Sequence, residues 1–428
     1  MILILGAGLT GLATAYFLKN RDCLVVEKEN RPGGLCRTTR CNGVHFDFTG
    51  HFLHMRDEEI KALVFDLLPD GWLQKERAAF IHYRDVYTPF PFQAYTHGLP
   101  PDVIRDCLVG YIKAYGARDR DPGKDPSFRA WVESRFGEGF AKHFFVPYNF
   151  KIWRTPLEEI TTEWVSWAVP MPAPEEVVDG ALGTGRARLG YNISFYYPAR
   201  GGIGTFTDAL ARRVEKIETG KEVSAVDHEN REVCFEDGSS QKYDLLVSTL
   251  PLKKLLRITT GIPAELKQAG EKLRYVSVLN LNLGIDRKDD SGRHWIYFPE
   301  EKFPFYRIGM PSNVSDSVSP PGTTSLSAEV SYLPGDKPAE EEVRASCIEK
   351  MKALEIIRPS DRIIAEQIKH IEYAYVIYDA HRRKHIDGVL SGLSALGIHS
   401  IGRYGAWEYS FMESSLLSGK NLAGTIMK

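Results

Sequence analysis

Three closely spaced glycines near the start of the chain constrain its fold more than any other feature. Residues 2–5 (ILIL) have the apolar character of a buried parallel strand, and Gly6, Gly8 and Gly11 follow before a helical pattern begins. The first glycine permits a tight turn, the second lets the backbone approach a pyrophosphate, and the third lets helix and strand pack closely. A second strand-like run ends at Glu27, about 20 residues downstream, where an acidic side chain accepts ribose hydroxyls in such folds. The pattern predicts a Rossmann-like dinucleotide-binding unit.

The composition is that of a soluble globular enzyme. Of 428 residues, 43% are hydrophobic and 26% charged, and 54 basic residues against 56 acidic ones give a net charge of −2. At roughly 150 residues per domain, the length predicts two or three domains. A nearly neutral chain has no overall field to hold nucleic acid or an anionic membrane, so we expect neither as a partner.

The six cysteines are scattered, without a CxxC pair or a spacing typical of zinc sites. This distribution argues against a disulfide framework and against a metal site, so we expect reduced thiols, no metal and a cytosolic location. The first 18 residues are apolar, but they lack the basic region and the cleavage site of a signal peptide. We expect no transmembrane segment.

A second glycine turn distinguishes FAD from NAD as the dinucleotide. The passage RPGGLCRT, at residues 31–38, directly follows the acid that would bind ribose. It resembles the FAD signature of the superfamily that contains amine oxidases, phytoene desaturases and sugar-nucleotide mutases. The resemblance implies FAD as the cofactor and adds donors for its phosphates around Gly33, Gly34, Leu35 and Arg37.

We expect an α/β fold with a discontinuous Rossmann-like FAD-binding domain, a helical insertion and an antiparallel sheet. In the superfamily, late segments such as YDLLVSTLP and SIGRYG return to complete the FAD-binding fold, whereas the runs YVSVLNLNLGI and HWIYF alternate like antiparallel strands. The expected FAD-binding domain comprises residues 1–56, 195–270 and 395–428. A mainly helical substrate domain is expected at 57–194, with a strand segment near 79–92, and an antiparallel sheet substrate domain at 271–394.

Residues 169–185 form the best candidate for a mobile loop. The segment VPMPAPEEVVDGALGTG is rich in proline and glycine and has few residues that would anchor it in a core. We therefore expect this segment to be a mobile loop.

Seven passages spread over most of the chain resemble the flavin-dependent UDP-galactopyranose mutases, the eukaryotic kind more than the usual bacterial kind. They are FDFTGH (46–51), YTPFPFQ (87–93), YNFKIW (148–153), YNISFYYPARGG (191–202), WIYFPE with FYR (295–300 and 305–307), YAYVIY (373–378) and GRYGAWEY (402–409).

The resemblance implies how the cofactor is held. His51 belongs to a glycine–histidine loop that, in the family, passes the flavin ring and responds to its redox state. We expect His51 and Arg307 to serve catalysis. The implied cofactor-binding residues are Gly6, Gly8, Thr10, Gly11, Glu27, Gly33, Gly34, Leu35, Arg37, Gly50, Val223, Gly402 and Arg403.

The resemblance also implies a nucleotide-sugar site. Aromatic faces that stack a uracil, and carboxamides that donate and accept along its edge, have the chemistry of a base-binding slot. A guanidinium offers a fixed fork to phosphate oxygens, and phenols add neutral donors. The implied residues are Phe90, Phe92, Gln93, Asn149 and Trp153 for uridine, Asn192 for the sugar, and Tyr297, Arg307, Tyr375 and Tyr409 for the diphosphate.

The chain departs from the family pattern in two places. Family members carry a second diphosphate arginine on a mobile loop, and this chain has Ala168 at the expected position; Arg186 and Arg188 are the candidates to replace it. The residues that usually follow Tyr409 are missing, which shortens a loop that contacts the flavin. Both departures leave the identity of the nucleotide sugar open.

The function that the resemblance implies is interconversion of the pyranose and furanose forms of UDP-galactose or a related nucleotide sugar. In that chemistry N5 of the reduced flavin attacks the anomeric carbon and expels the nucleoside diphosphate, so no catalytic triad is needed. NADPH or NADH would supply the electrons. One alternative is an FAD-dependent oxidase or desaturase of the wider superfamily, which shares the glycine motifs but does not predict the polar slot. Another is a non-catalytic flavin-binding regulator, which would bind ligand without turnover. The sugar, the reductant and homo-oligomerisation stay open.

Overall fold

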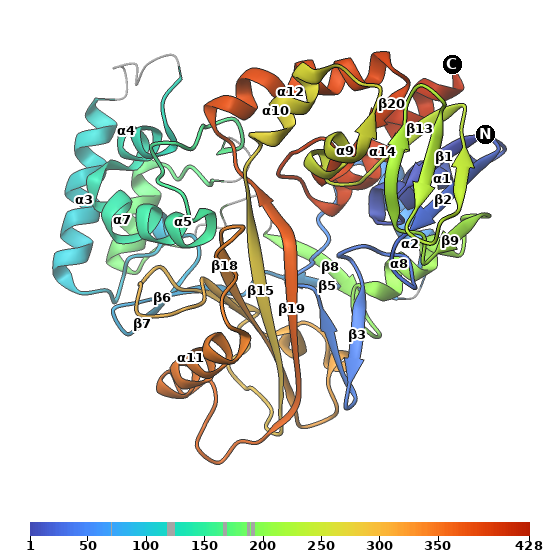
Figure 1. The fold of residues 1–428 in the computed structure, drawn as a ribbon. Coiled ribbons are helices and arrows are strands. Elements are labelled where there is room, and N and C mark those ends of the chain that lie inside the picture. Colours follow the sequence, from blue (N-terminus) through green and yellow to red (C-terminus); the bar gives the residue numbers. More distant parts are fainter. Residues whose placement is uncertain (70, 118–124, 166–168, 186–188, 190–192) are drawn as a thin grey trace.

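A computed structural model describes the chain except for residues 70, 118–124, 166–168, 186–188 and 190–192. Figure 1 shows three neighbouring regions: a region at the right that holds both termini, a long sheet at the centre, and a group of helices at the left. The mixture of one parallel sheet with antiparallel sheets confirms the expected α/β class.

A five-stranded parallel sheet forms the region beside the termini. Its order is β20 (Ile398–Ser400), β13 (Leu245–Ser248), β1 (Ile2–Leu5), β2 (Cys23–Glu27) and β9 (Ile217–Thr219). The central strand β1 is almost completely buried and pairs with β13 on one side and β2 on the other. Strands from three distant parts of the chain therefore form one sheet.

The first and last helices of the chain pack against each other beside this sheet. A side chain on Gly419, in α14 (Met412–Met427), would meet the backbone nitrogen of Thr14, in α1 (Leu9–Phe17), at 2.7 Å. The absence of a side chain at Gly419 therefore allows α14 to lie directly on the helix that follows the glycine motif. Helix α8 (Gly204–Ala211) also contacts α1.

Within the described residues, three smaller sheets accompany the two large ones. A four-stranded sheet has the order β12 (Ser240–Lys242), β11 (Glu232–Phe235), β10 (Val223–Asp227) and β14 (Thr259–Thr260). Two-stranded antiparallel pairs are formed by β3 (Thr38–Cys41) with β4 (Val44–Asp47), and by β5 (Trp72–Glu76) with β8 (Ser194–Pro198). Strand β4 leads directly into the passage that carries His51.

A seven-stranded sheet forms the centre of the molecule. Its order is β19 (Ile363–Val376), β15 (Tyr275–Ile285), β18 (Thr324–Tyr332), β17 (Arg307–Gly309), β16 (Trp295–Tyr297), β6 (Ala79–Tyr83) and β7 (Val86–Pro89). Strands β6 and β7 lie within residues 79–92, where the sequence predicts a strand segment inside the mainly helical domain. They extend the sheet because β6 pairs in parallel with β16, Ala79 opposite Trp295.

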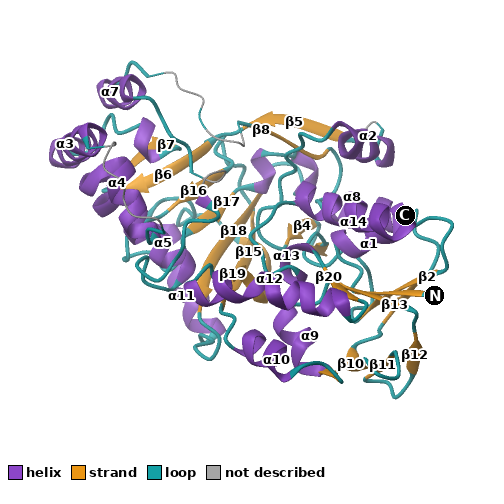
Figure 2. Cartoon of the chain, turned by 90° about the horizontal axis from the view of Figure 1, so that it is seen from above, coloured by secondary structure: helices purple, strands orange, loops and turns teal. Residues whose placement is uncertain are grey.

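The helical region packs at the far side from the termini, as the view from above shows (Figure 2). It contains α3 (Pro101–Gly116), α4 (Phe128–Phe140), the π-helical turn η2 (Ala141–Phe145), α5 (Val146–Trp153) and α7 (Pro174–Leu182). Helix α7 occupies most of the segment predicted to be a mobile loop. Val177 is buried there, and a side chain on Gly180 would meet the carbonyl oxygen of Ala94 at 1.9 Å, so this part is anchored, contrary to the expectation.

The structure contains nine further helices in its described ranges. They are α2 (Glu58–Leu67), η1 (Phe92–Ala94), α9 (Leu252–Ile258), α10 (Ala264–Glu271), η3 (Pro311–Asn313), η4 (Asp316–Val318), α11 (Glu340–Ala353), α12 (Ala380–Ala395) and α13 (Gly402–Gly405). None of the helices in the described ranges has the length and apolarity that crossing a bilayer requires.

A buried histidine joins β6 to β16 and gives the fold a pH dependence. The backbone N–H of Ala78 donates to Nδ1 of His294 at 3.2 Å, and the N–H of His294 donates to the carbonyl oxygen of Ala78 at 2.8 Å. Burial, with the nearby charge of Lys75, lowers the pKa of His294 from 6.5 to about 4. Acidification from pH 6.5 towards 4 therefore protonates the unfolded chain before the folded one, and the free energy of unfolding falls.

We expect His294→Asn to reduce this acid sensitivity, because the asparagine Oδ1 still accepts from Ala78 but does not titrate. Between about pH 7 and pH 5, the free energy of unfolding should fall by about 2 kcal/mol less in the variant than in the wild type. Urea unfolding at both pH values measures this difference, with His97→Asn, at an exposed position, as the control. An equal fall in wild type and His294→Asn would contradict the prediction.

Candidate active site

A cavity of about 780 Å³ reaches from the parallel sheet to the seven-stranded sheet. Almost all residues that the sequence assigns to cofactor and substrate line it. They are Gly6, Gly8, Thr10, Glu27, Gly33, Gly34, Leu35, Arg37, Gly50, His51, Phe90, Gln93, Asn149, Trp153, Val223, Tyr297, Arg307, Tyr375, Gly402, Arg403 and Tyr409.

The glycine turns at one end of the cavity fit a dinucleotide. Gly6 has φ +97°, and a side chain on Gly34 would meet the Cα of Gly8 at 3.0 Å, so the two turns approach each other closely. Gly11 does not line the cavity: a side chain there would lie 2.0 Å from the carbonyl oxygen of Gly6, which fits a packing role. Exposed backbone N–H groups at a helix start bind phosphate groups.

Glu27 is fixed at the carboxyl end of β2. Its Oε2 accepts from the N–H of Ala7 at 2.8 Å and its Oε1 accepts from the N–H of Glu29 at 3.0 Å. Both oxygens keep further lone pairs that can accept ribose hydroxyls. The carboxylate, the two glycine turns and the long cavity together have the chemistry that FAD requires.

Arg37 and Thr10 support the turns around this end of the cavity. The Nε of Arg37 donates to the carbonyl oxygen of Gly34 at 2.8 Å, and its guanidinium lies over the ring of Phe48, 5.3 Å from the centroid. Gly402 has φ +78° and lies against Thr10, because a side chain at Gly402 would meet Thr10 Oγ1 at 2.5 Å.

His51 is half-buried at the side of the cavity and neutral. Burial, with the positive charges of Arg403 and Arg307, lowers the pKa of His51 from 6.5 to about 4. Its Nδ1 is buried and finds no hydrogen-bond partner among the residues that the structure describes. A ligand in the cavity could satisfy this nitrogen, since buried polar atoms rarely stay unpaired.

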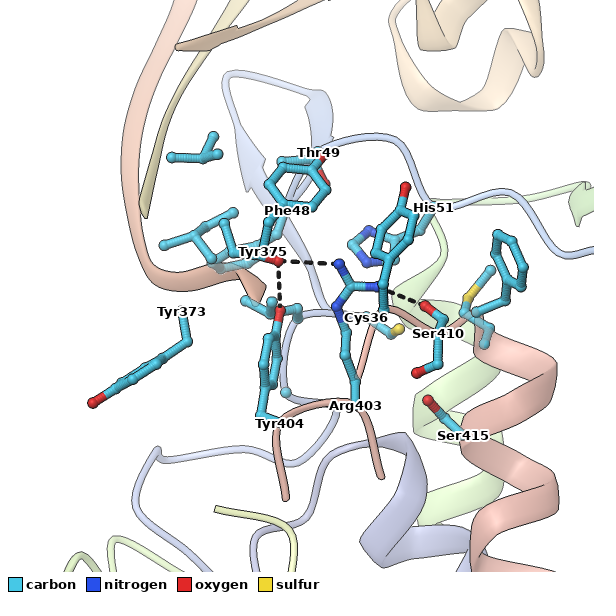
Figure 3. A pocket seen from close by; sticks show the side chains of 18 of the residues that line it. Cys36, Phe48, Thr49, His51, Tyr373, Tyr375, Arg403, Tyr404, Ser410 and Ser415 are labelled. Carbon is cyan, nitrogen blue, oxygen red and sulfur yellow. Dashed lines mark hydrogen bonds between the residues drawn. The ribbon is translucent and has the colours of Figure 1, made fainter. Parts of the chain in front are cut away.

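Arg403 lies between His51 and a group of phenols, as Figure 3 shows. Its Nη1 donates to the carbonyl oxygen of Ser410 at 2.5 Å and its Nη2 donates to that of Ala374 at 3.0 Å. Its guanidinium lies 4.9 Å from the ring centroid of Tyr409. Backbone carbonyls and aromatic faces thus orient this arginine and leave it a source of positive charge in the cavity.

Arg307 is paired with a carboxylate that the sequence reasoning missed. Its Nε and Nη2 donate to Glu329 Oε1 at 2.9 and 2.7 Å, and Nη2 also donates to Oε2 at 2.8 Å. The side chain of Glu329 is only 1% exposed, and Tyr306 donates its hydroxyl to the same carboxylate. In the described hydrogen bonds of Arg307, Nε and Nη2 are used and Nη1 is left for a ligand. The guanidinium can therefore offer a ligand the donors of Nη1, but not a pair of nitrogens.

The phenols around Arg307 stay protonated. Burial raises the pKa of Tyr297 and of Tyr375, even though the charge of Arg307 lowers both. The hydroxyls of Tyr375 and Tyr306 lie 3.2 Å apart. Neutral phenols next to a cation are suited to donate hydrogen bonds to an anionic ligand.

The aromatic and amide residues assigned to uridine border the same cavity. Trp153 is 2% exposed, donates from Nε1 to Asn149 Oδ1 at 3.2 Å, and packs edge-on against Tyr375 and Tyr409. Gln93 donates from Nε2 to the carbonyl oxygen of Pro170 at 2.7 Å. The base-binding candidates and the diphosphate candidates are therefore in contact.

Phe90 and Phe92 have different places. Phe90 lines the cavity and packs against Tyr297, 5.2 Å between ring centroids. Phe92 is fully buried outside the lining and stacks on Phe144 at 5.0 Å, so it belongs to the core and does not face the cavity as expected. Alternation along the PFPFQ passage did not distinguish the two rings, because the chain turns at η1.

Some predicted residues cannot be placed. The described residues do not include Asn192, Arg186 or Arg188. The two arginines are the candidates to replace the family arginine, whose expected position is occupied by Ala168. Across the described ranges, no three histidine, cysteine or acidic side chains are grouped as a metal site would require.

Comparisons with known proteins agree with this geometry. The chain is similar to a crystal structure of reduced UDP-galactopyranose mutase, with a TM-score of 0.94 and 28% identity over 100% of this chain and 93% of the other. It shares the fold of a putrescine oxidase double mutant, with a TM-score of 0.69 and 13% identity over 100% and 98%. Coproporphyrinogen III oxidase from Staphylococcus aureus is 21% identical over 68% of this chain and 69% of its own length.

The family comparison covers nearly the whole chain. The model of the flavin-containing amine oxidoreductases matches residues 9–427, from the start of α1 to the end of α14. This match and the glycine-lined cavity lead to one conclusion: the chain belongs to the flavin-containing amine oxidoreductase family, and its cofactor is FAD.

Proposed function

We propose that this chain is a flavin-dependent nucleotide-sugar mutase that interconverts pyranose and furanose forms of UDP-galactose or a related sugar nucleotide. The observation that carries the proposal is one cavity in which the dinucleotide turns, His51, Arg307 and a slot of phenols and amides meet. The likeness to a reduced UDP-galactopyranose mutase supports it. NADPH or NADH is the proposed reductant.

When bound, reduced FAD would supply the nucleophile for the anomeric carbon of the sugar. The chain itself has to hold the leaving diphosphate close to that carbon. Arg307 Nη1 and the hydroxyls of Tyr297, Tyr375 and Tyr409 are the donors proposed for the diphosphate oxygens. Because these groups are held by buried neighbours before any ligand binds, they can stabilise the developing negative charge without reorganising.

The other proposed roles concern binding and protonation. Trp153, Asn149, Gln93 and Phe90 would hold the uridine, which fixes the diphosphate relative to the reacting carbon. His51, neutral because its pKa is about 4, can donate or accept one hydrogen bond without adding a charge. The packing of Trp153 on Tyr375 and Tyr409 would exclude water between the base and the diphosphate.

The test is conversion of UDP-galactopyranose and UDP-galactofuranose by dithionite-reduced protein, followed by chromatography, with oxidised protein as the control. We expect conversion only in the reduced sample. Tight UDP binding without conversion would point to another nucleotide sugar. The absence of both conversion and UDP binding would overturn the proposal and favour an oxidase or desaturase. Oxygen consumption with amines or porphyrinogens would then detect that activity.

A further inference from the structure

The passage that carries His51 contains an unusual backbone conformation. Thr49 has φ +65°. Among the described residues other than glycine that have a positive φ, Thr49 is the one with a β-branched side chain. The others are Asn20, Asn42, Arg84, Asp85, Arg154, Arg231, Glu355 and Trp407. A β-branched side chain is unfavourable in the left-handed region, by roughly 1–2 kcal/mol. Such a residue persists only where its surroundings hold it.

A buried carboxamide of the central sheet holds Thr49. The N–H of Thr49 donates to Oδ1 of Asn280, at 3.2 Å, and Asn280 is 0% exposed. The other end of the same amide is fixed on β18, because Nδ2 donates to Ser327 Oγ at 2.8 Å and to the carbonyl oxygen of Ala328 at 3.2 Å. The amide therefore cannot turn away from Thr49 without losing bonds on both sides.

Asn280 belongs to a row of residues that lie directly opposite one another on adjacent strands. Arg307 on β17 is opposite Glu329 on β18, Glu329 is opposite Asn280 on β15, and Asn280 is opposite Lys369 on β19. Directly opposite residues of antiparallel strands share one face of a sheet. We call these four residues the cross-strand row.

The His51 passage lies across this row. Phe48 is in contact with Lys369, whose Nζ lies 5.2 Å from the ring centroid, and Thr49 is bonded to Asn280. Next along the chain, a side chain on Gly50 would come within 3.8 Å of Arg307 Nη2. Figure 3 shows Phe48 and Thr49 together, and His51, two residues after Thr49, close to the guanidinium of Arg403. Phe48, Thr49 and Gly50 thus meet Lys369, Asn280 and Arg307 in the order in which these three lie along the row.

We propose that Asn280 is a positioning residue for His51: by holding Thr49 in the left-handed conformation, it directs the passage so that His51 faces the cavity next to Arg307. The proposal rests on the proposed function in one respect, because His51 is taken to face the bound flavin and the substrate. Asn280 itself does not line the cavity.

The test uses Asn280→Leu, Thr49→Gly and the double variant, all loaded with FAD. Leucine has nearly the size of asparagine but no acceptor, so Thr49 should leave its conformation and His51 should move. We expect an altered visible circular dichroism spectrum of the flavin, and a loss of kcat of about 10- to 100-fold with little change of KM. Glycine tolerates a positive φ without an acceptor, so Thr49→Gly in the same chain should restore the spectrum and most of kcat.

Asn282→Leu is the matched control. Asn282 lies two residues along β15, is 1% exposed, and donates from Nδ2 to Asn280 Oδ1 at 2.8 Å, but makes no described hydrogen bond to the His51 passage. This variant should lower the melting temperature and leave the flavin spectrum and kcat unchanged. If Asn280→Leu does not fold, Asn280→Ser, which is too short to reach Thr49, replaces it with the same expectations.

Two results would overturn the proposal. One is an unchanged flavin spectrum in Asn280→Leu; the other is an altered spectrum that Thr49→Gly does not restore, which would mean that Asn280 only stabilises the core. The spectrum does not depend on sugar conversion. If the proposed function is wrong, the wild type will not convert the sugar nucleotide. That result can be distinguished from failure of the Asn280 proposal, which the flavin spectrum reports.

Discussion

Replacing Arg307 by alanine is expected to lower the free energy of unfolding by about 3–5 kcal/mol, in addition to abolishing turnover. The reason is Glu329, whose side chain is 1% exposed and receives three hydrogen bonds from Arg307. Removing the guanidinium leaves a buried carboxylate with Tyr306 as its remaining described partner. Urea unfolding of the wild type and Arg307→Ala measures the loss.

A double variant separates stability from binding. In Arg307→Met with Glu329→Leu, two apolar side chains replace the pair, so most of the lost unfolding free energy should return. Binding of UDP-galactopyranose should not return, because the diphosphate still lacks a charge-assisted bond of about 1.5–3 kcal/mol. Calorimetric titration of the double variant measures this. If the double variant is no more stable than Arg307→Ala, the loss of stability in Arg307→Ala does not come from leaving the Glu329 carboxylate unpaired.

The pairing changes what the arginine offers to a substrate. Burial works against its charge, but Glu329 and the phenols of Tyr375, Tyr306 and Tyr297 raise the pKa of Arg307 well above its ordinary value. The guanidinium is therefore permanently charged and fixed in position, while its own carboxylate partner offsets part of that charge. Binding of a diphosphate by this chain must rely on neutral donors as much as on Coulomb attraction.

Local patterns made much of the fold predictable. The strand, the three glycines and the helix at the start are neighbours in sequence, and their spacing is dictated by backbone contacts such as Gly11 with the carbonyl of Gly6. The pairing of β6 with β16 joins Ala79 to Trp295. No local pattern specifies such a partner, so these strands could be recognised but not assigned to the central sheet.

Sequence motifs predicted residues that line the cavity, but residues placed by pairing across strands were not predicted. Glu329 and Asn280 lie opposite each other on β18 and β15, outside the seven passages that resemble the mutases. The available signal was chemical: a carboxylate within the apolar and small run TSLSAEVSY, and amides within YVSVLNLNLGI, must find partners if those strands are buried. Arg307 and the Thr49 N–H are those partners.

Trp153→Ala is expected to cost about 3–5 kcal/mol of unfolding free energy, the cost of removing a fully buried tryptophan. Trp153 is 2% exposed and packs against Trp164, 5.1 Å between ring centroids, as well as Tyr375 and Tyr409. The alanine variant also removes the donor to Asn149 Oδ1. We expect weaker UDP binding and an unchanged flavin absorption spectrum, because the dinucleotide turns lie at the other end of the cavity.

Two further variants show whether the loss of UDP binding reflects contact or general loosening. Phe136→Ala removes a ring that is 0% exposed and stacks on Phe145 in the same helical region but outside the cavity lining, so it should lower stability similarly and leave UDP affinity unchanged. Trp153→Phe keeps an aromatic face without the N–H donor, so stability should fall less than in Trp153→Ala. Calorimetric titration with UDP compares the three. Equal weakening by Phe136→Ala and Trp153→Ala, or loss of flavin from Trp153→Ala, would assign Trp153 to the core alone and remove the principal aromatic contact from the proposed uridine slot.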